Sequence, residues 1–93
     1  MGPGPFMAAY TKMPMERKIK MIWDFRGPGA EQTARHHKIH LDEFAQARNL
    51  DFFPSGVEPM AEFHWTAYLV VGESQVPGLR EILKPHRGQV HIG

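Results

Sequence analysis

The chain contains no cysteine. It therefore has no disulfide framework, no thiolate nucleophile and no zinc site built on cysteine. A strong net charge is also missing, because eleven Lys and Arg residues stand against ten Asp and Glu residues. Nucleic-acid binders and anionic-membrane binders normally carry a stronger positive field. No apolar run approaches the roughly 18 residues of a membrane-spanning helix, so we expect no membrane partner and a cytoplasmic protein.

Bulky apolar residues and histidines are well represented. Hydrophobic residues make up 42% of the 93 residues, and two Trp and six Phe supply bulk for a core. This length suits one small domain of marginal stability, and such domains often gain stability by pairing. The six histidines are the compositional feature that points to chemistry.

The first part of the chain differs from the rest. Residues 1–17 show neither helical nor strand periodicity, and the Gly-Pro-Gly-Pro run at 2–5 can hold neither element. We expect a flexible leader, or residues left by cloning, followed by one domain over residues 18–93.

Two segments alternate as strands do. Apolar residues occupy every second position of residues 18–25 and again of 63–71, which predicts two strands. The alternation places Trp23 on one side of the first strand, and Phe63 and Trp65 on the same side of the second. The remaining patterned segments predict a long helix over 30–49, an edge strand over 51–59, a short helix over 76–83 with Ser74 as its N-cap, and a last strand over 89–92 with Val90 and Ile92 facing the core.

The element order is therefore β-α-β-β-α-β, and we predict an α+β domain of ferredoxin-like type. Short linkers and right-handed crossovers favour an antiparallel four-stranded sheet ordered 4-1-3-2, with both helices on one face. The side of the sheet that carries Trp23 and Trp65 should be the one covered by helices.

Three segments of the chain carry a resemblance to a known group. The stretches "MIWDFRGPG", "AYLVVGES" and "LKPHRGQVHIG" are similar to the dimeric α+β barrel superfamily, which includes EthD-like, YCII-like and antibiotic-monooxygenase-like domains. The resemblance covers roughly residues 18–92. The resemblance implies a homodimer in which two sheets pack through their helix-free faces. Because members include small-molecule enzymes and haem-handling proteins, it implies no single activity.

A polar group on the helix-free face is the candidate catalytic site. Asp24, His64 and His91 all alternate onto that face, and Tyr68 shares it. Asp24 and His64 should be cross-strand neighbours, and a carboxylate that accepts a bond from imidazole fixes the tautomer a general base needs. Such a pair would suit proton abstraction or isomerisation on a small organic molecule. The alternative is a structural polar layer that fixes the register between subunits.

Other polar residues are candidates for ligand binding. Arg26, at the turn before the long helix, could bind an anion, and His37 and Trp65 complete the candidate set. His36 and His40 are spaced to share a metal, and His37 could ligate haem by analogy with haem-handling relatives. No further residue supports either group, so we predict no cofactor, with haem or a divalent metal as the alternative.

Two further segments receive a non-functional interpretation. Lys84, His86 and Arg87 are interpreted as a solvated helix end. RNA-recognition domains share this element order but place stacking aromatics on the open sheet face, where only Tyr68 lies here. We therefore expect no nucleic-acid partner.

Overall fold

The computed structural model describes residues 17–50 and 54–91. Apart from Arg17, the expected leader lies outside the described residues, as do Phe52, Phe53 and Ile92. The elements follow in the order β1 (Lys18–Arg26), α2 (Ala30–Ala47), β2 (Ser55–Ala61), β3 (His64–Gly72), a 3-10 turn η1 (Glu73–Gln75), α3 (Val76–Leu83) and β4 (Arg87–Val90). This is the predicted β-α-β-β-α-β order.

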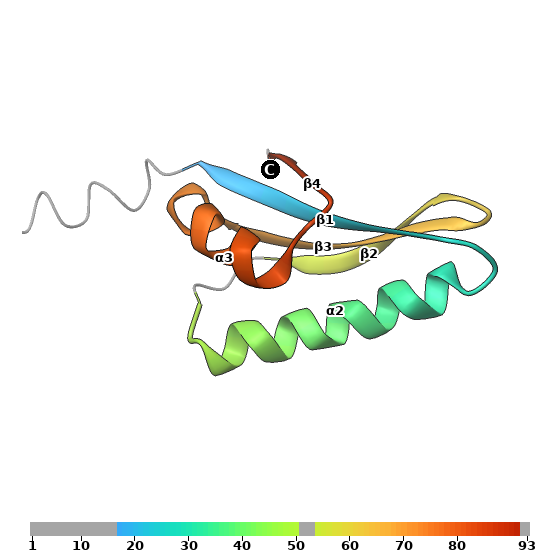
Figure 1. Cartoon of the computed structure of the whole chain (residues 1–93), viewed down its shortest axis with the longest axis horizontal. Coiled ribbons are helices and arrows are strands. Elements are labelled where there is room, and N and C mark those ends of the chain that lie inside the picture. Colours follow the sequence, from blue (N-terminus) through green and yellow to red (C-terminus); the bar gives the residue numbers. More distant parts are fainter. Residues whose placement is uncertain (1–16, 51–53, 92–93) are drawn as a thin grey trace, which may run out of the picture.

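The four strands form one antiparallel sheet in the order β2-β3-β1-β4 (Figure 1). Read from the opposite edge, this is the expected order 4-1-3-2. In the central β1–β3 pair, Trp23 lies opposite Ala67 and Asp24 lies opposite Thr66. Because neighbouring residues of a strand point to opposite faces, this register separates an apolar face from a polar one.

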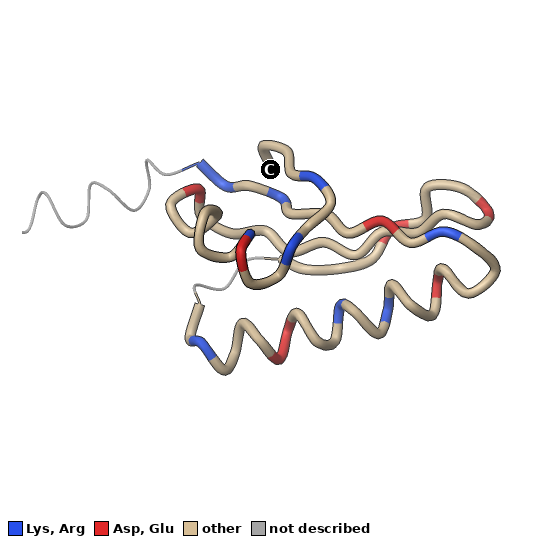
Figure 2. The backbone as a smooth tube through the Cα atoms, in the orientation of Figure 1, with Lys and Arg blue, Asp and Glu red and all other residues tan. Residues whose placement is uncertain are grey.

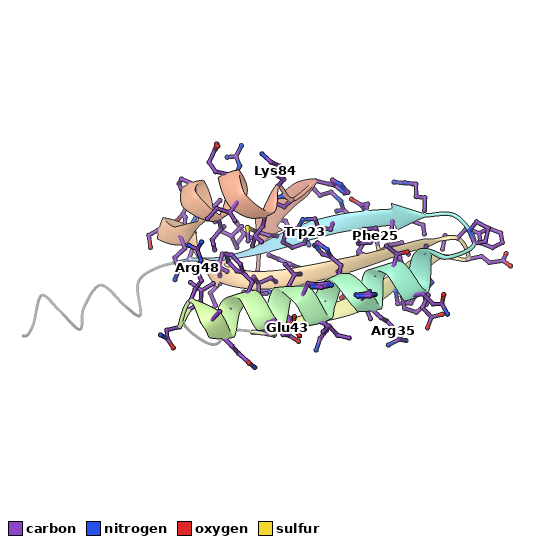
Figure 3. All side chains as sticks on the ribbon, turned by 60° about the horizontal axis from the view of Figure 1, so that its bottom comes forward. Trp23, Phe25, Arg35, Glu43, Arg48 and Lys84 are labelled. Carbon is purple, nitrogen blue, oxygen red and sulfur yellow. The ribbon has the colours of Figure 1, made fainter. Side chains whose placement is uncertain are left out.

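The core lies between the sheet and the two helices. One cluster joins strand residues with residues of both helices: Met21, Trp23, Ala34, Leu41, Ala67, Leu69, Val71 and Leu79. Trp23 is 3% exposed, and its Nε1–H donates to the Leu83 carbonyl at 2.9 Å. In Figure 3, Trp23 lies between the ribbons of α3 and α2. The predicted phase of the strands is thus confirmed.

Helix α2 is held at its start and along its length. Gly27 adopts φ 110°, a conformation that favours glycine, and its carbonyl accepts the Ala30 N–H at 3.0 Å. Acidic and basic residues both occur along the helix (Figure 2). Asp42 accepts hydrogen bonds from Lys38 and from Ser55 of β2, which ties the helix to the sheet edge. No helix in the described ranges is both long enough and apolar enough to cross a membrane.

Helix α3 begins with a different N-cap from the predicted one. The predicted N-cap, Ser74, lies inside the 3-10 turn, and Gln75 occupies the cap position without a side-chain cap bond. A proline at the start of the helix supplies the fixed φ that helix starts tolerate. The helix ends as expected before Pro85, with Lys84 in the left-handed conformation at φ 50°.

Two apolar residues lie outside the core, contrary to prediction. Phe63 is 54% exposed because the chain turns there between β2 and β3, so the strand begins one residue later. Val90 is 46% exposed although its register beside Ile19 places it on the helix-covered side. The short α3 does not reach far enough across the sheet to bury Val90.

Candidate functional site

The helix-free face of the sheet has a buried floor. Ile22, Thr66 and Val70 are almost fully buried there, although no helix covers them. Longer polar side chains from all four strands lie around this floor. They form two separate hydrogen-bonded groups.

The first group joins Asp24, His64 and Arg87. His64 Nε2 lies 2.8 Å from Asp24 Oδ1. Arg87 donates from Nε to Oδ2 at 2.9 Å and from Nη2 to Oδ1 at 3.0 Å. The side chains of Asp24 and His64 are 14% and 19% exposed, and that of Arg87 is 44% exposed. The predicted cross-strand pair is therefore present, with an arginine added to it.

The electrostatics of this group keep the carboxylate ionised. Hydrogen bonding from the Arg87 guanidinium, aided by that from His64, holds the pKa of Asp24 well below its usual range, although burial opposes the shift. An ionised carboxylate only accepts hydrogen bonds, so the hydrogen between it and His64 belongs to Nε2 of the imidazole. In the neutral ring, Nδ1 then carries the lone pair.

The segment before β4 holds Asp24 by its backbone as well. The Asp24 N–H donates to His86 Nδ1 at 2.8 Å, and the His86 N–H donates to the Ile22 carbonyl at 2.9 Å. The consecutive residues His86 and Arg87 therefore hold the main chain and the carboxylate of Asp24, respectively. Interpreting His86 and Arg87 as a solvated helix end missed this role. The signal available was the strand order, which puts β4 next to β1, but the sequence does not reveal their register.

The second group joins Lys20, Glu58 and Tyr68. Lys20 Nζ lies 3.1 Å from Glu58 Oε1 and 4.4 Å from the centre of the Tyr68 ring. Gly56 makes room for that ring, because an added Cβ would lie 2.8 Å from Tyr68 Oη. Tyr68 thus shares the face with Asp24, as predicted, but its ring contacts Lys20 of the second group instead of the Asp24 group.

The other predicted site residues are divided between the two faces. Arg26 is exposed and lies opposite His64 in the β1–β3 register, so it borders the first group. The His91 N–H donates to the Lys18 carbonyl, at the other end of β1 from Asp24. Trp65 lies on the helix-covered face, with the Arg35 guanidinium 5.5 Å from its ring centre.

His37 is enclosed among aromatic rings on the helix-covered side. Its ring centre lies 5.0 Å from that of Trp23 and 5.5 Å from that of Phe25. Nε2 of His37 is buried and has no hydrogen-bond partner within residues 17–50 and 54–91. Burial lowers the pKa of His37, and the positive charges that His40 and His86 can carry lower it further. The residue therefore packs as a neutral ring.

The pair expected to share a metal lies on the surface of α2. The rings of His36 and His40 stack with centres 4.8 Å apart. Within residues 17–50 and 54–91, no group of three or more acidic or histidine residues is arranged to hold a metal ion.

Together these contacts give one residue pair suited to proton transfer. Asp24 is held from three sides and remains ionised, so it orients His64 and stabilises the imidazolium but is itself a weak base. His64 Nδ1 is the proton acceptor of the group. Two cavities among the described residues lie elsewhere, one between β4 and α3 and one between the end of α2 and β2. A closed cavity over His64 would require a second layer above this face.

Comparison of the chain with protein-family models, with curated proteins and with solved structures gave no match. The four-stranded antiparallel sheet with two helices is compatible with a ferredoxin-like fold.

Proposed function

We propose that the chain is a ferredoxin-like domain of the dimeric α+β barrel type that binds and deprotonates a small organic acid on the helix-free face of its sheet. The observation that carries this proposal is the 2.8 Å contact between His64 Nε2 and Asp24 Oδ1, with Arg87 bound to both carboxylate oxygens. This arrangement is the one that orients an imidazole as a general base.

The reaction is removal of a proton from a carbon next to a carbonyl. The C–H bond breaks, the proton moves to His64 Nδ1, and the electron pair remains on the substrate as an enolate. Return of the proton to the same or a neighbouring atom completes an exchange or an isomerisation. Arg26, opposite His64 on the same face, provides a cation for a substrate carboxylate.

A second copy of the chain would provide the missing layer above this face. The Asp24–His64–Arg87 group and the Lys20–Glu58 pair are already satisfied within one chain, so a partner can cover them without leaving those charges unsatisfied. Exclusion of water by the partner would strengthen the electrostatic effect of Asp24 on His64.

The test is exchange of the methyl protons of pyruvate in D₂O, followed by ¹H NMR. The wild-type protein should accelerate exchange above buffer, His64→Gln should abolish the acceleration, and Asp24→Asn should reduce it. His36→Gln, which removes an exposed histidine of α2, is the control and should leave the rate unchanged. Exchange that is absent, or equal in wild type and His64→Gln, would contradict the proposal.

A second candidate is a non-catalytic homodimer in which the same polar group fixes the register of the subunits. Its support is that Arg87 already occupies both oxygens of Asp24, as expected of a satisfied structural network. This function predicts no exchange, together with a weaker dimer in Asp24→Asn and His64→Gln when dissociation is followed by light scattering.

A further inference from the structure

A groove of about 450 Å³ lies on the opposite side of the sheet from the Asp24–His64 group, between β4 and α3. Ile19 and Met21 of β1, Val76 of α3 and Val90 of β4 contribute its apolar lining. A volume of this size is typical of sites for small organic molecules. The lining residues of the groove come from both β4 and α3, together with two residues of β1.

Two residues of β4, Gly88 and Val90, leave this groove partly open. Gly88, opposite Met21, has no side chain to fill it, although an added Cβ would make only ordinary contact, 3.6 Å from Ile19 Cγ2. Val90 is exposed on the same side because α3 does not cover it. Exposed apolar surface at a concave place is typical of a binding site.

The polar lining of the groove is cationic. Arg80 of α3 contributes to the wall, and its guanidinium has no ion-pair partner among residues 17–50 and 54–91. Glu73 is the acidic residue of the lining, and Arg17 already binds it through two hydrogen bonds of 3.1 and 2.6 Å. Arg87 is bound to Asp24 on the other side of the sheet. Among the described residues, the unpaired charge in the groove is therefore that of Arg80.

We propose that this groove binds a small amphipathic carboxylate, with its apolar chain over Ile19, Met21 and Val90 and its carboxylate on the Arg80 guanidinium. Apolar contact supplies most of the burial, and the charge-assisted hydrogen bonds to arginine fix the orientation. The site lies on the other side of the sheet from His64. Its test therefore does not depend on the proposed proton-transfer function.

The test is titration of the ¹⁵N-labelled protein with hexanoate, with hexanamide as the neutral molecule of similar shape. Hexanoate should give saturable shifts of the amides of Ile19, Arg80 and Val90, and hexanamide should bind about tenfold more weakly because it lacks the charge. No shifts with hexanoate, or equal affinity for the two molecules, would overturn the proposal.

Three variants locate the site. Arg80→Gln should weaken hexanoate binding about tenfold. Gly88→Val should block the groove while preserving the fold, which thermal unfolding checks. Lys84→Gln is the control, because it removes the same charge at the end of α3. Lys84 does not line the groove and points away from α2 in Figure 3. This variant should bind hexanoate as the wild type does. Unchanged binding in both Arg80→Gln and Gly88→Val would overturn the assignment.

Discussion

At the scale of single residues, Asp24 is the most heavily bonded side chain of the candidate site. It accepts hydrogen bonds from both His64 and Arg87 while its own side chain is 14% exposed. Removing one member of such a group leaves the others with unmet hydrogen-bonding needs. Asp24 should therefore contribute to stability as well as to the site.

Asp24→Asn should lower the free energy of unfolding by about 1–3 kcal/mol at pH 7. Because the folded pKa of Asp24 lies below its ordinary value of 3.8, this contribution is full above that value and is lost as the pH falls through the folded pKa. Urea unfolding between pH 3 and 7 measures the difference. Glu31→Gln, which breaks the exposed pair with Arg35, is the control and should change stability by less than about 0.5 kcal/mol. Equal losses in the two variants would contradict the role given to Asp24.

His37 should make the fold sensitive to acid. Its pKa is lowered by burial, so the unfolded chain binds a proton at a higher pH than the folded one does. Stability should fall as the pH drops below the ordinary histidine value of 6.5, by at most about 1.4 kcal/mol per pH unit from this residue. His37→Leu should remove that part of the pH dependence, whereas exposed His40→Gln should keep it. Thermal unfolding of the three proteins from pH 8 to 5 gives the comparison, and parallel curves for wild type and His37→Leu would rule the effect out.

The sequence predicted one part of the site and missed another. The pairing of Asp24 with His64 could be predicted because β1 and β3 alternate clearly, and a period of two fixes which side chains share a face. The bonds of Arg87 could not be, because β4 has four residues and no clear alternation to fix its register. The distance of His91 along β1 from Asp24 depends on that same register, and the backbone bond of His91 to Lys18 lies at the other end of β1.

At the scale of elements, periodicity predicted the existence of the long strands and of α2. It was less successful in predicting the residues at which they begin and end. The core stripe of α2 is buried at Ala30, Ala34 and Leu41, as the helical spacing required. Phe63 continued the alternation of β3 in the sequence, yet the turn between β2 and β3 takes it out of the strand. Turn geometry depends on the register shift in β2, between Pro59 and Ala61. The breakers of this segment indicated an edge strand with a possible bulge, but not the position of the bulge.

The packing of Tyr68 against β2 should depend on Gly56. A Cβ at Gly56 would lie 2.8 Å from Tyr68 Oη and 3.0 Å from Cζ, so Gly56→Ala must displace the ring. We expect the free energy of unfolding to fall by about 1–3 kcal/mol and the Tyr68 ring resonances to shift. Gly88→Ala is the matched control on the other edge strand, since its Cβ would make ordinary contact, and it should change stability by less than 1 kcal/mol. A similar cost for both glycines would show that Tyr68 does not occupy this position.

At the scale of the whole molecule, the sheet has one face covered by α2 and α3 and one face that no helix of the described residues covers. If a second copy covers the helix-free face, the protein in solution should have the mass of a dimer. Light scattering after size exclusion should give about twice the chain mass of 10.6 kDa. Gln89→Glu, which adds a charge to the helix-free face, should shift the protein toward monomer, while Ile39→Lys on the exposed outer side of α2 should not. A wild-type protein that is monomeric over the micromolar to millimolar range would contradict the dimer.

The central claim is that Asp24 orients His64 as a base, and the most direct test is the tautomer of His64. ¹⁵N chemical shifts of the neutral imidazole distinguish a proton on Nε2 from one on Nδ1. In the wild type the proton should reside on Nε2. Asp24→Asn should weaken this preference most, and Arg87→Gln should weaken it less. A proton on Nδ1 in the wild type, or the same tautomer mixture in wild type and Asp24→Asn, would contradict the role of Asp24 in orienting His64.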